Sequence, residues 1–340
     1  MLEVQKVLAD LVSFNTIRDK ENKQIMDYIE NTMKTIGFKT EKRDKYLIMY
    51  NKPEVSLGFI GHTDVVEFTD GWEYDQFKLS KAQDKLYGLG VCDMKSGIAG
   101  IISAISQIDF NKKDKGMKLY FTYDEEINFS GIKDIVAYES KFPKTIIVGE
   151  PTNNELIVGS KGLMEYKIIL KGIQSHSSRP DRGENAILKT IDFINELREF
   201  YINEIKIKNN DNFEVPYTTM NIGKINGGTV INSVPDNCEI LVDFRTIDKE
   251  SENKITNFLE LLKNKYNVQI QELNKVSPFL NLTSISSKTS DFITEASFVE
   301  NERIILGAGP VTAHEVNECI TVQSLDRLVE QYKELIKKYC

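Results

Sequence analysis

The sequence predicts an α/β protein with a mostly parallel sheet, into which a smaller α+β domain is inserted. Strand-like and helix-like segments alternate over the first half of the chain, which is typical of parallel sheets. Beyond about residue 162 the order of the elements becomes β-α-β-β-α-β, the order of a ferredoxin-like unit. We therefore expect one domain formed by residues 1–162 and 275–340 and a second formed by residues 163–274.

Helices and strands are expected in turn along the first half. Apolar residues at helical spacing, or a run rich in small residues, predict helices at Val4–Val12, Asn22–Ile36 and Met94–Ile108. Short apolar or alternating runs predict strands at Leu57–Ile60, Met117–Tyr123 and Thr145–Val148.

The inserted segment shows its own pattern. Alternating residues predict strands at Met164–Lys171, Thr218–Ile225, Glu239–Arg245 and Val268–Glu272. Helical spacing predicts helices at Glu184–Tyr201 and Glu252–Lys265, and a final helix at Val322–Lys338.

Composition excludes several classes of partner. The 340 residues include 43 basic and 51 acidic residues, with a net charge of −8, so nucleic acid or an anionic membrane surface is not expected as the main partner. No apolar run approaches the roughly 18 residues that a membrane span needs. The first residues do not have the pattern of a signal peptide, and we expect a cytoplasmic protein. The four cysteines form no C-x-x-C pair, which argues against a structural zinc site or a disulfide framework.

Acidic and histidine side chains follow several of the predicted strands. They are His62, Asp64, Asp93, Glu125, Glu126 and Glu150, and His314 follows a glycine-rich stretch near the end. Ligands of open α/β sheets bind beyond the carboxyl ends of the strands, so these residues are expected at one edge. Two imidazoles and several carboxylates suit zinc or a pair of divalent metals. A carboxylate two residues after His62 can fix the tautomer of its ring.

Each of these residues has a simpler interpretation when it is taken alone. A single histidine after a strand is more often structural, and an Asp-Glu-Glu triplet is usually a solvated turn. Asp93 can cap the following helix. Gly88 and Gly90 resemble a dinucleotide-binding loop, but the third glycine of that motif is missing. The combination of all the candidates favours a metal site.

The motifs resemble those of the dinuclear zinc hydrolases that include acetylornithine deacetylase, succinyl-diaminopimelate desuccinylase, aminoacylase and glutamate carboxypeptidase. The matching segments span nearly the whole chain in the order of the family; they are Gly61–Val66, Tyr87–Gly97, Thr122–Glu126, Gly149–Thr152, Ser175–Pro180 and Ala313–Glu318.

The resemblance implies a role for each matched residue. Asp93 would bridge two divalent metals, Zn²⁺ or Co²⁺. One metal would also be held by His62 and Glu150, and the other by Glu126 and His314. Glu125 would be the general base, and Asp64 would orient His62. The peptide between Asp93 and Met94 is expected to be cis.

The resemblance also assigns roles to the inserted domain, as a lid and as a dimerisation domain. His176 is similar to a lid histidine that polarises the scissile carbonyl, commonly from the partner subunit of a homodimer. Arg245 is similar to an arginine that grips the α-carboxylate of the substrate, and Asn232 to a substrate-facing loop residue. Without the family, His176 would be a solvated loop residue and Arg245 an exposed residue at a strand end.

Zinc-dependent hydrolysis of an N-acyl amino acid is the activity that this resemblance implies. The segment from Ser175 to Ile187 is closest to the acetylornithine deacetylase pattern, which predicts deacetylation of N-acetylornithine in arginine biosynthesis. Val316–Ile320 resembles the desuccinylase ending instead, so succinyl-diaminopimelate remains an alternative substrate. Two further interpretations stay open, a dipeptidase or carboxypeptidase and an inactive relative that binds amino acids.

Overall fold

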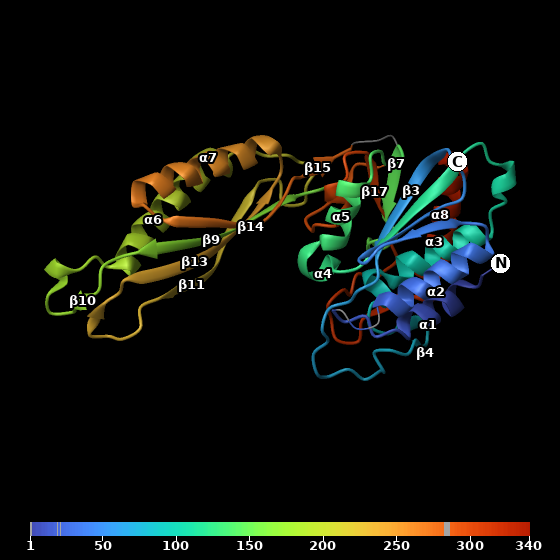
Figure 1. Ribbon diagram of the computed structural model, residues 1–340, viewed down its shortest axis with the longest axis horizontal. Coiled ribbons are helices and arrows are strands. Elements are labelled where there is room, and N and C mark those ends of the chain that lie inside the picture. The colour runs from blue at the N-terminus through green and yellow to red at the C-terminus, as the bar shows by residue number, and fades with distance from the viewer. Residues whose placement is uncertain (1, 19, 21, 282–285) are drawn as a thin grey trace. The chain divides into compact units, whose positions relative to one another are not determined.

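The computed structural model describes residues 2–18, 20, 22–281 and 286–340. Its chain forms two compact units (Figure 1). The first comprises Met1–Val158, Asn281–Ser286 and Thr294–Cys340, and the second comprises Gly159–Leu280 and Ser287–Ile293.

The first unit is built on a sheet whose strands run in the order β1-β2-β6-β3-β7-β17-β8. Their bounds are β1 Lys39–Lys42, β2 Tyr46–Tyr50, β3 Val55–His62, β6 Gly116–Thr122, β7 Thr145–Val148, β8 Ile157–Ser160 and β17 Glu302–Ile305. The four central strands β6, β3, β7 and β17 are parallel, whereas β1, β2 and β8 pair antiparallel. All four residues of β7 are buried, as expected of a parallel strand covered on both faces.

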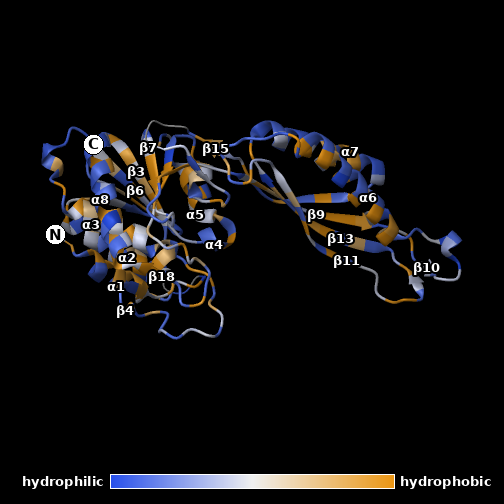
Figure 2. Cartoon of the chain, turned by 180° about the vertical axis from the view of Figure 1, so that it is seen from behind, coloured by the Kyte–Doolittle hydropathy of each residue, from blue (hydrophilic) through white to orange (hydrophobic). Residues whose placement is uncertain are grey.

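Helices cover this sheet. They are α1 Val4–Val12, α2 Asn22–Thr35, α3 Ser96–Ser106, α4 Glu125–Asn128, α5 Ser130–Tyr138 and α8 Val322–Tyr339. Every residue of α3 except Ser106 is buried, and apolar colouring continues from α3 onto the central strands (Figure 2). The small residues of α3 permit this burial, because a Cβ on Gly97 would lie 2.2 Å from the carbonyl oxygen of Gly149.

A smaller sheet in the first unit has the order β18-β5-β4. Its strands are β4 Ser80–Ala82, β5 Lys85–Tyr87 and β18 Cys319–Thr321. Pairing of β18 with β5 brings the segment that follows His314 beside the segment that precedes Asp93.

The second unit contains a four-stranded antiparallel sheet in the order β11-β13-β9-β14. Its elements are β9 Gly162–Lys171, α6 Ala186–Phe200, β11 Thr219–Gly227, β13 Asn237–Thr246, α7 Lys249–Tyr266 and β14 Gln269–Val276. Asn185 and Asp248 cap the two helices by accepting backbone N–H bonds. Phe193 and Leu197 of α6 pack in one core with Ile255 and Leu259 of α7. The second unit also contains a short two-stranded antiparallel ladder, β10 Ser175–His176 with β12 Ser233–Val234, and the strands β15 Phe279–Leu280 and β16 Lys288–Ser290.

The predicted fold class is confirmed by this arrangement. The order β-α-β-β-α-β recurs as β9-α6-β11-β13-α7-β14, and the main sheet of the first unit is mostly parallel. Among the strands of the main sheet, β1, β2, β8 and β17 were not anticipated. The described part of the chain has no helix with the length and apolar character of a membrane span.

Candidate metal centre

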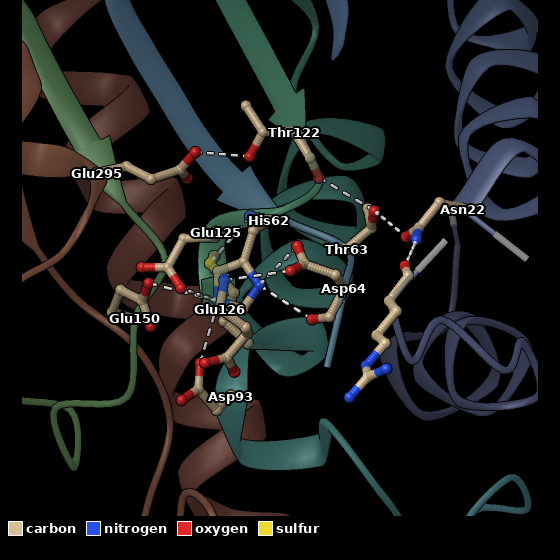
Figure 3. A network of polar contacts seen from close by, with 12 residues as sticks. Asn22, His62, Thr63, Asp64, Asp93, Thr122, Glu125, Glu126, Glu150 and Glu295 are labelled. Atoms are coloured by element: carbon tan, nitrogen blue, oxygen red, sulfur yellow. Dashed lines mark hydrogen bonds and ion pairs between the residues drawn. The ribbon is translucent and has the colours of Figure 1, made fainter. Parts of the chain in front are cut away.

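Six of the predicted side chains meet at the carboxyl ends of the parallel strands. Figure 3 shows five of them, all except His314. His62 ends β3, Glu125 and Glu126 begin α4 just after β6, and Glu150 lies two residues beyond β7. Asp93 lies in the short π-helical turn Val91–Lys95 that leads into α3, and His314 lies in the loop between β17 and β18. The parallel topology therefore gathers residues that are up to 252 positions apart in the sequence, from His62 to His314.

His62 lies at the centre of one group of ligand atoms. Its Nε2 is 3.1 Å from Asp93 Oδ1 and 3.5 Å from Glu150 Oε1. The imidazole is fully buried. These three residues have ligand atoms that all lie within 4.8 Å of one another.

Asp93 and His314 form a second group with Glu126. His314 Nε2 is 3.2 Å from Glu126 Oε2 and 3.6 Å from Asp93 Oδ2. Asp93 therefore directs one carboxylate oxygen to each group, which is the arrangement of a bridging ligand. The peptide between Asp93 and Met94 is cis, as the family motif implied.

Glu125 is the remaining carboxylate, and it lies beside both groups. Its Oε2 is 4.0 Å from His62 Nε2, and its ligand atom also fits a third group with His62 and Glu126. Its side chain is buried.

Burial and crowding change the pKa values of these groups. Burial raises the pKa of Glu125 well above its usual value, and burial together with Asp93 raises that of Glu150 to about 8. Burial lowers the pKa of His62, but the carboxylates of Glu125 and Glu150 outweigh it and raise the pKa well above its ordinary range. The hydrogen bond to Glu126 raises the pKa of His314 to about 9.

The donor set fits divalent cations. His62 Nδ1 lies 3.0 Å from the carbonyl oxygen of Asp64, which can only accept, so Nδ1 carries a proton. Nε2 faces the carboxylate oxygens of Asp93 and Glu150. With a neutral ring, acceptors would face acceptors there, and the raised pKa of His62 reflects the gain from a second proton on Nε2. A divalent cation among imidazole and carboxylate ligands resolves this conflict.

Asp64 orients its neighbours through different atoms from those expected. Its carbonyl oxygen, at 3.0 Å, is closer to His62 Nδ1 than its carboxylate Oδ1, at 3.5 Å. The other carboxylate oxygen, Oδ2, accepts the backbone N–H of Glu126 at 3.2 Å. Asp64 therefore contacts one residue from each of the two groups.

Two solved structures of M20 metallopeptidases share the fold of this chain. A metallo-carboxypeptidase of the M20 family from Sulfolobus solfataricus has the same fold, with a TM-score of 0.80 and 16% identity over 100% of this chain and 99% of that one. A dinuclear metal-binding peptidase of the M20 family from Bacillus subtilis has a TM-score of 0.72 at 12% identity, covering 99% and 98% of the two chains.

Sequence comparison decides the family. Residues 158–269 match the model of the M20 peptidase dimerisation domain. An acetylornithine deacetylase from Photorhabdus laumondii is 31% identical over 95% of this chain and 92% of its own length. The chain belongs to the M20 family. The family that the motifs indicated is thereby confirmed, and M20 relatives of this kind are hydrolases of amide bonds.

The second unit of this M20 protein carries the other predicted residues. His176 ends β10, and Asn232 immediately precedes β12. In the antiparallel β10–β12 ladder His176 pairs with Ser233, and the Ser177 N–H donates to the Asn232 carbonyl at 3.0 Å. The backbone N–H of Ser178 lies 3.2 Å from His176 Nδ1, which therefore accepts. The neutral ring then carries its proton on Nε2.

Arg245 lies elsewhere in the second unit, near the end of β13. Its Nε donates to Asp243 Oδ1 at 3.2 Å. The strand that pairs with His176, β12, lies three residues before the other end of β13, at Asn237. The eight residue steps from Asn237 to Arg245 span roughly 26 Å at about 3.3 Å each. The structure therefore does not bring Arg245 and His176 together within one chain.

Three polar residues near these sites received no role in the sequence analysis. Glu318 accepts backbone N–H groups of the Asp93 segment, Ser178 holds the His176 ring, and Glu295 is buried beside Thr122. The first two lie inside the segments that match the family, four residues after His314 and two after His176, so their spacing was a usable signal. Glu295 had no such signal.

Proposed function

We propose that the chain is a metal-dependent deacylase of N-acyl amino acids and that its substrate is N-acetylornithine. The observation that carries the proposal is the pair of ligand groups sharing Asp93, with the buried Glu125 beside them. The nature of the acyl group rests on the acetylornithine deacetylase from Photorhabdus laumondii. Deacetylation of N-acetylornithine belongs to arginine biosynthesis, and the expected cytoplasmic location stays a prediction.

His62, Asp93 and Glu150 would hold one divalent cation, and Asp93, Glu126 and His314 the other. We propose Zn²⁺ as the metal, with Co²⁺ as a functional substitute. Two such cations would supply electrophilic assistance to the substrate carbonyl and would make a water molecule more acidic.

Glu125 is assigned the proton transfers. Its carboxylate takes a proton from the attacking water, whose oxygen bonds to the amide carbon. When the carbon–nitrogen bond breaks, Glu125 gives that proton to the leaving amine, and the products are acetate and ornithine. The burial of Glu125 keeps this proton from exchanging with bulk water.

His176 and Arg245 are assigned to the substrate. The Nε2–H of His176 would donate to the carbonyl oxygen as negative charge develops there. The Nε of Arg245 is held by Asp243, which leaves the two terminal amino groups to pair with the α-carboxylate of the substrate. Asn232, which precedes β12 beside His176 of β10, is proposed to contact the substrate from its loop.

A homodimer accounts for the separation of these two residues. About 26 Å lies between the two ends of β13, more than a small N-acyl amino acid can bridge. We propose that the second unit, residues 163–274 in the predicted division, is the lid and dimerisation domain, and that residues 1–162 and 275–340 are catalytic. His176 would then act on a substrate held by Arg245 of the other protomer.

The test is release of primary amine by zinc- or cobalt-loaded protein from N-acetyl-L-ornithine, N-succinyl-diaminopimelate and a dipeptide. We expect the fastest release from N-acetyl-L-ornithine, its loss in a chelator and its return with Zn²⁺ or Co²⁺. Faster release from one of the other compounds would contradict the substrate but not the chemistry. Release from none of them, with metal bound, would favour an amino-acid-binding protein.

A further inference from the structure

Glu318 is a buried carboxylate whose partners in the first unit are backbone N–H groups. Its Oε2 accepts the N–H of Gly90 at 2.7 Å, and its Oε1 accepts those of Cys92 at 2.7 Å and Asp93 at 2.9 Å. Its side chain is nearly inaccessible to solvent, so these bonds compensate the loss of hydration.

The three N–H groups belong to the segment that carries Asp93 into α3. Gly90 has φ +79°, and a Cβ at this position would lie 2.6 Å from Val65 Cγ1, so the turn requires glycine. Convergent backbone N–H groups beside a left-handed residue form a concavity that attracts an anion. In this protein the anion is the Glu318 carboxylate.

The same residue belongs to the loop that carries His314. This loop is closed by Thr312, whose hydroxyl accepts the N–H of Cys319 at 2.9 Å and donates to its carbonyl at 2.8 Å. His314 and Asn317 have φ values of +64° and +59°, which non-glycine residues rarely adopt. A loop with two such residues keeps its shape only where neighbouring contacts hold it.

We propose that Glu318 is a positioning residue that fixes the Asp93 segment to the His314 loop and so sets the distance between two metal ligands. Asp93 and His314 belong to the same ligand group, and Glu318 ties the backbone of one to the loop of the other. The role rests on the metal site of the proposed function. It does not depend on which amide is hydrolysed.

The role requires a carboxylate in particular. Two oxygens accept three N–H groups, whereas the amide of glutamine offers one accepting oxygen and turns its NH₂ toward an N–H group. Glu318→Gln therefore keeps the size of the side chain but loses the bond to Gly90 or those to Cys92 and Asp93. Glu318→Asp keeps both accepting oxygens on a shorter stem.

Glu252→Gln is the matched control. Glu252 is as buried as Glu318, at 2% exposure, but it lies in the second unit and contacts the hydroxyls of Thr246 and Ser277. Both variants replace one buried carboxyl group with an amide, so a difference between them reports the position of Glu318.

The experiment titrates metal-free protein with Co²⁺ and records binding heat and the visible absorption of the bound ion. For Glu318→Gln we expect the second equivalent of Co²⁺ to bind about 10- to 100-fold more weakly and with an altered spectrum. We expect Glu252→Gln to match the wild type and Glu318→Asp to recover part of the affinity. Thermal melting in the presence of a chelator shows whether metal-free Glu318→Gln folds. If it does not fold, the Co²⁺ titration of Glu318→Asp tests the proposed role instead.

Wild-type Co²⁺ affinities and spectra in the folded Glu318 variants would overturn the proposal, even if their metal-free melting temperatures fell. That result would make Glu318 a residue for stability alone. The readout uses no substrate, so it is separable from the proposed function. If the wild type binds two Co²⁺ ions but cleaves no amide, the proposed function is contradicted. The Co²⁺ titration of the Glu318 variants would still test the role of Glu318.

Discussion

At the scale of single residues, the neighbouring glutamates at positions 125 and 126 illustrate how one turn separates two roles. Glu126 lies 3.2 Å from His314 Nε2. Glu125 instead lies beside His62 (Figure 3). Asp124, which precedes them, has φ +73° and begins the short helix α4 directly after β6. The turn between β6 and α4 therefore sends the two carboxylates to different partners.

Glu125→Gln tests the role of the proton carrier. We expect kcat to fall by roughly 10²- to 10⁴-fold, because an amide cannot accept the proton of the attacking water. The content of bound Zn²⁺ or Co²⁺, measured by elemental analysis, should stay at the wild-type value. Loss of one metal ion together with activity would show instead that Glu125 is a ligand, as its place in the third group allows.

At the scale of elements, Glu295 shows that packing a loop against the main sheet buries a carboxyl group. It begins the single turn Glu295–Phe298 and is fully buried beside β6, where its Oε1 accepts the hydroxyl of Thr122 at 2.6 Å. Its Oε2 has no hydrogen-bond partner among the described residues. Burial raises the pKa of Glu295 from 4.5 to about 7.

Glu295→Gln is expected to change the pH dependence of stability. Between pH 4.5 and 7 the folded protein binds more protons at Glu295 than the unfolded chain does, so stability falls as pH rises through this range. The change attributable to this group is on the order of 3 kcal/mol and is complete above about pH 7. Glutamine has no charge to bury and removes the effect.

Urea unfolding of the metal-free wild type and Glu295→Gln at pH 5 and pH 8 measures this difference. We expect the variant to gain stability relative to the wild type at pH 8 and to gain much less at pH 5. Glu252→Gln provides a comparison with a second buried carboxylate. An equal effect of Glu295→Gln at both pH values would contradict a charge-burial cost.

At the scale of the whole molecule, the second unit presents an apolar edge. β11 is the outermost strand of its sheet, and the start of α6 lies beside the end of β11, where a Cβ on Gly227 would be 3.1 Å from Ile187 Cγ1. Leu188 and Ile191 of α6 are 59% and 44% exposed, and Ile225 of β11 is 54% exposed. An open strand edge with apolar neighbours favours pairing with a second chain.

The double variant Leu188→Lys and Ile191→Lys is expected to convert a dimer into a monomer, because two buried charges would oppose association. Light scattering after size-exclusion chromatography measures the mass. The control is Leu261→Lys, which adds a charge at a 65% exposed position of α7. If His176 acts on the active site of the other protomer, loss of the dimer also lowers kcat. An unchanged mass of the double variant would show that this surface is not the dimer interface.

The sequence by itself determined the fold class, the family and the set of metal-binding candidates. Periodicity of two or about 3.6 residues is a local property, and so is the order β-α-β-β-α-β. His62, Asp93, Glu125, Glu126 and Glu150 could be selected because each follows or precedes an element that a local pattern predicts.

The tertiary structure alone decided which candidates face one another and what holds them. Asp93 directs one oxygen to each ligand group, and the carbonyl rather than the carboxylate of Asp64 is closest to His62 Nδ1. Glu318 contacts backbone N–H groups 225 to 228 positions away, and Glu295 contacts Thr122 across 173. These contacts depend on strand order and loop closure, which bring distant segments together by packing and leave no periodic trace in the sequence.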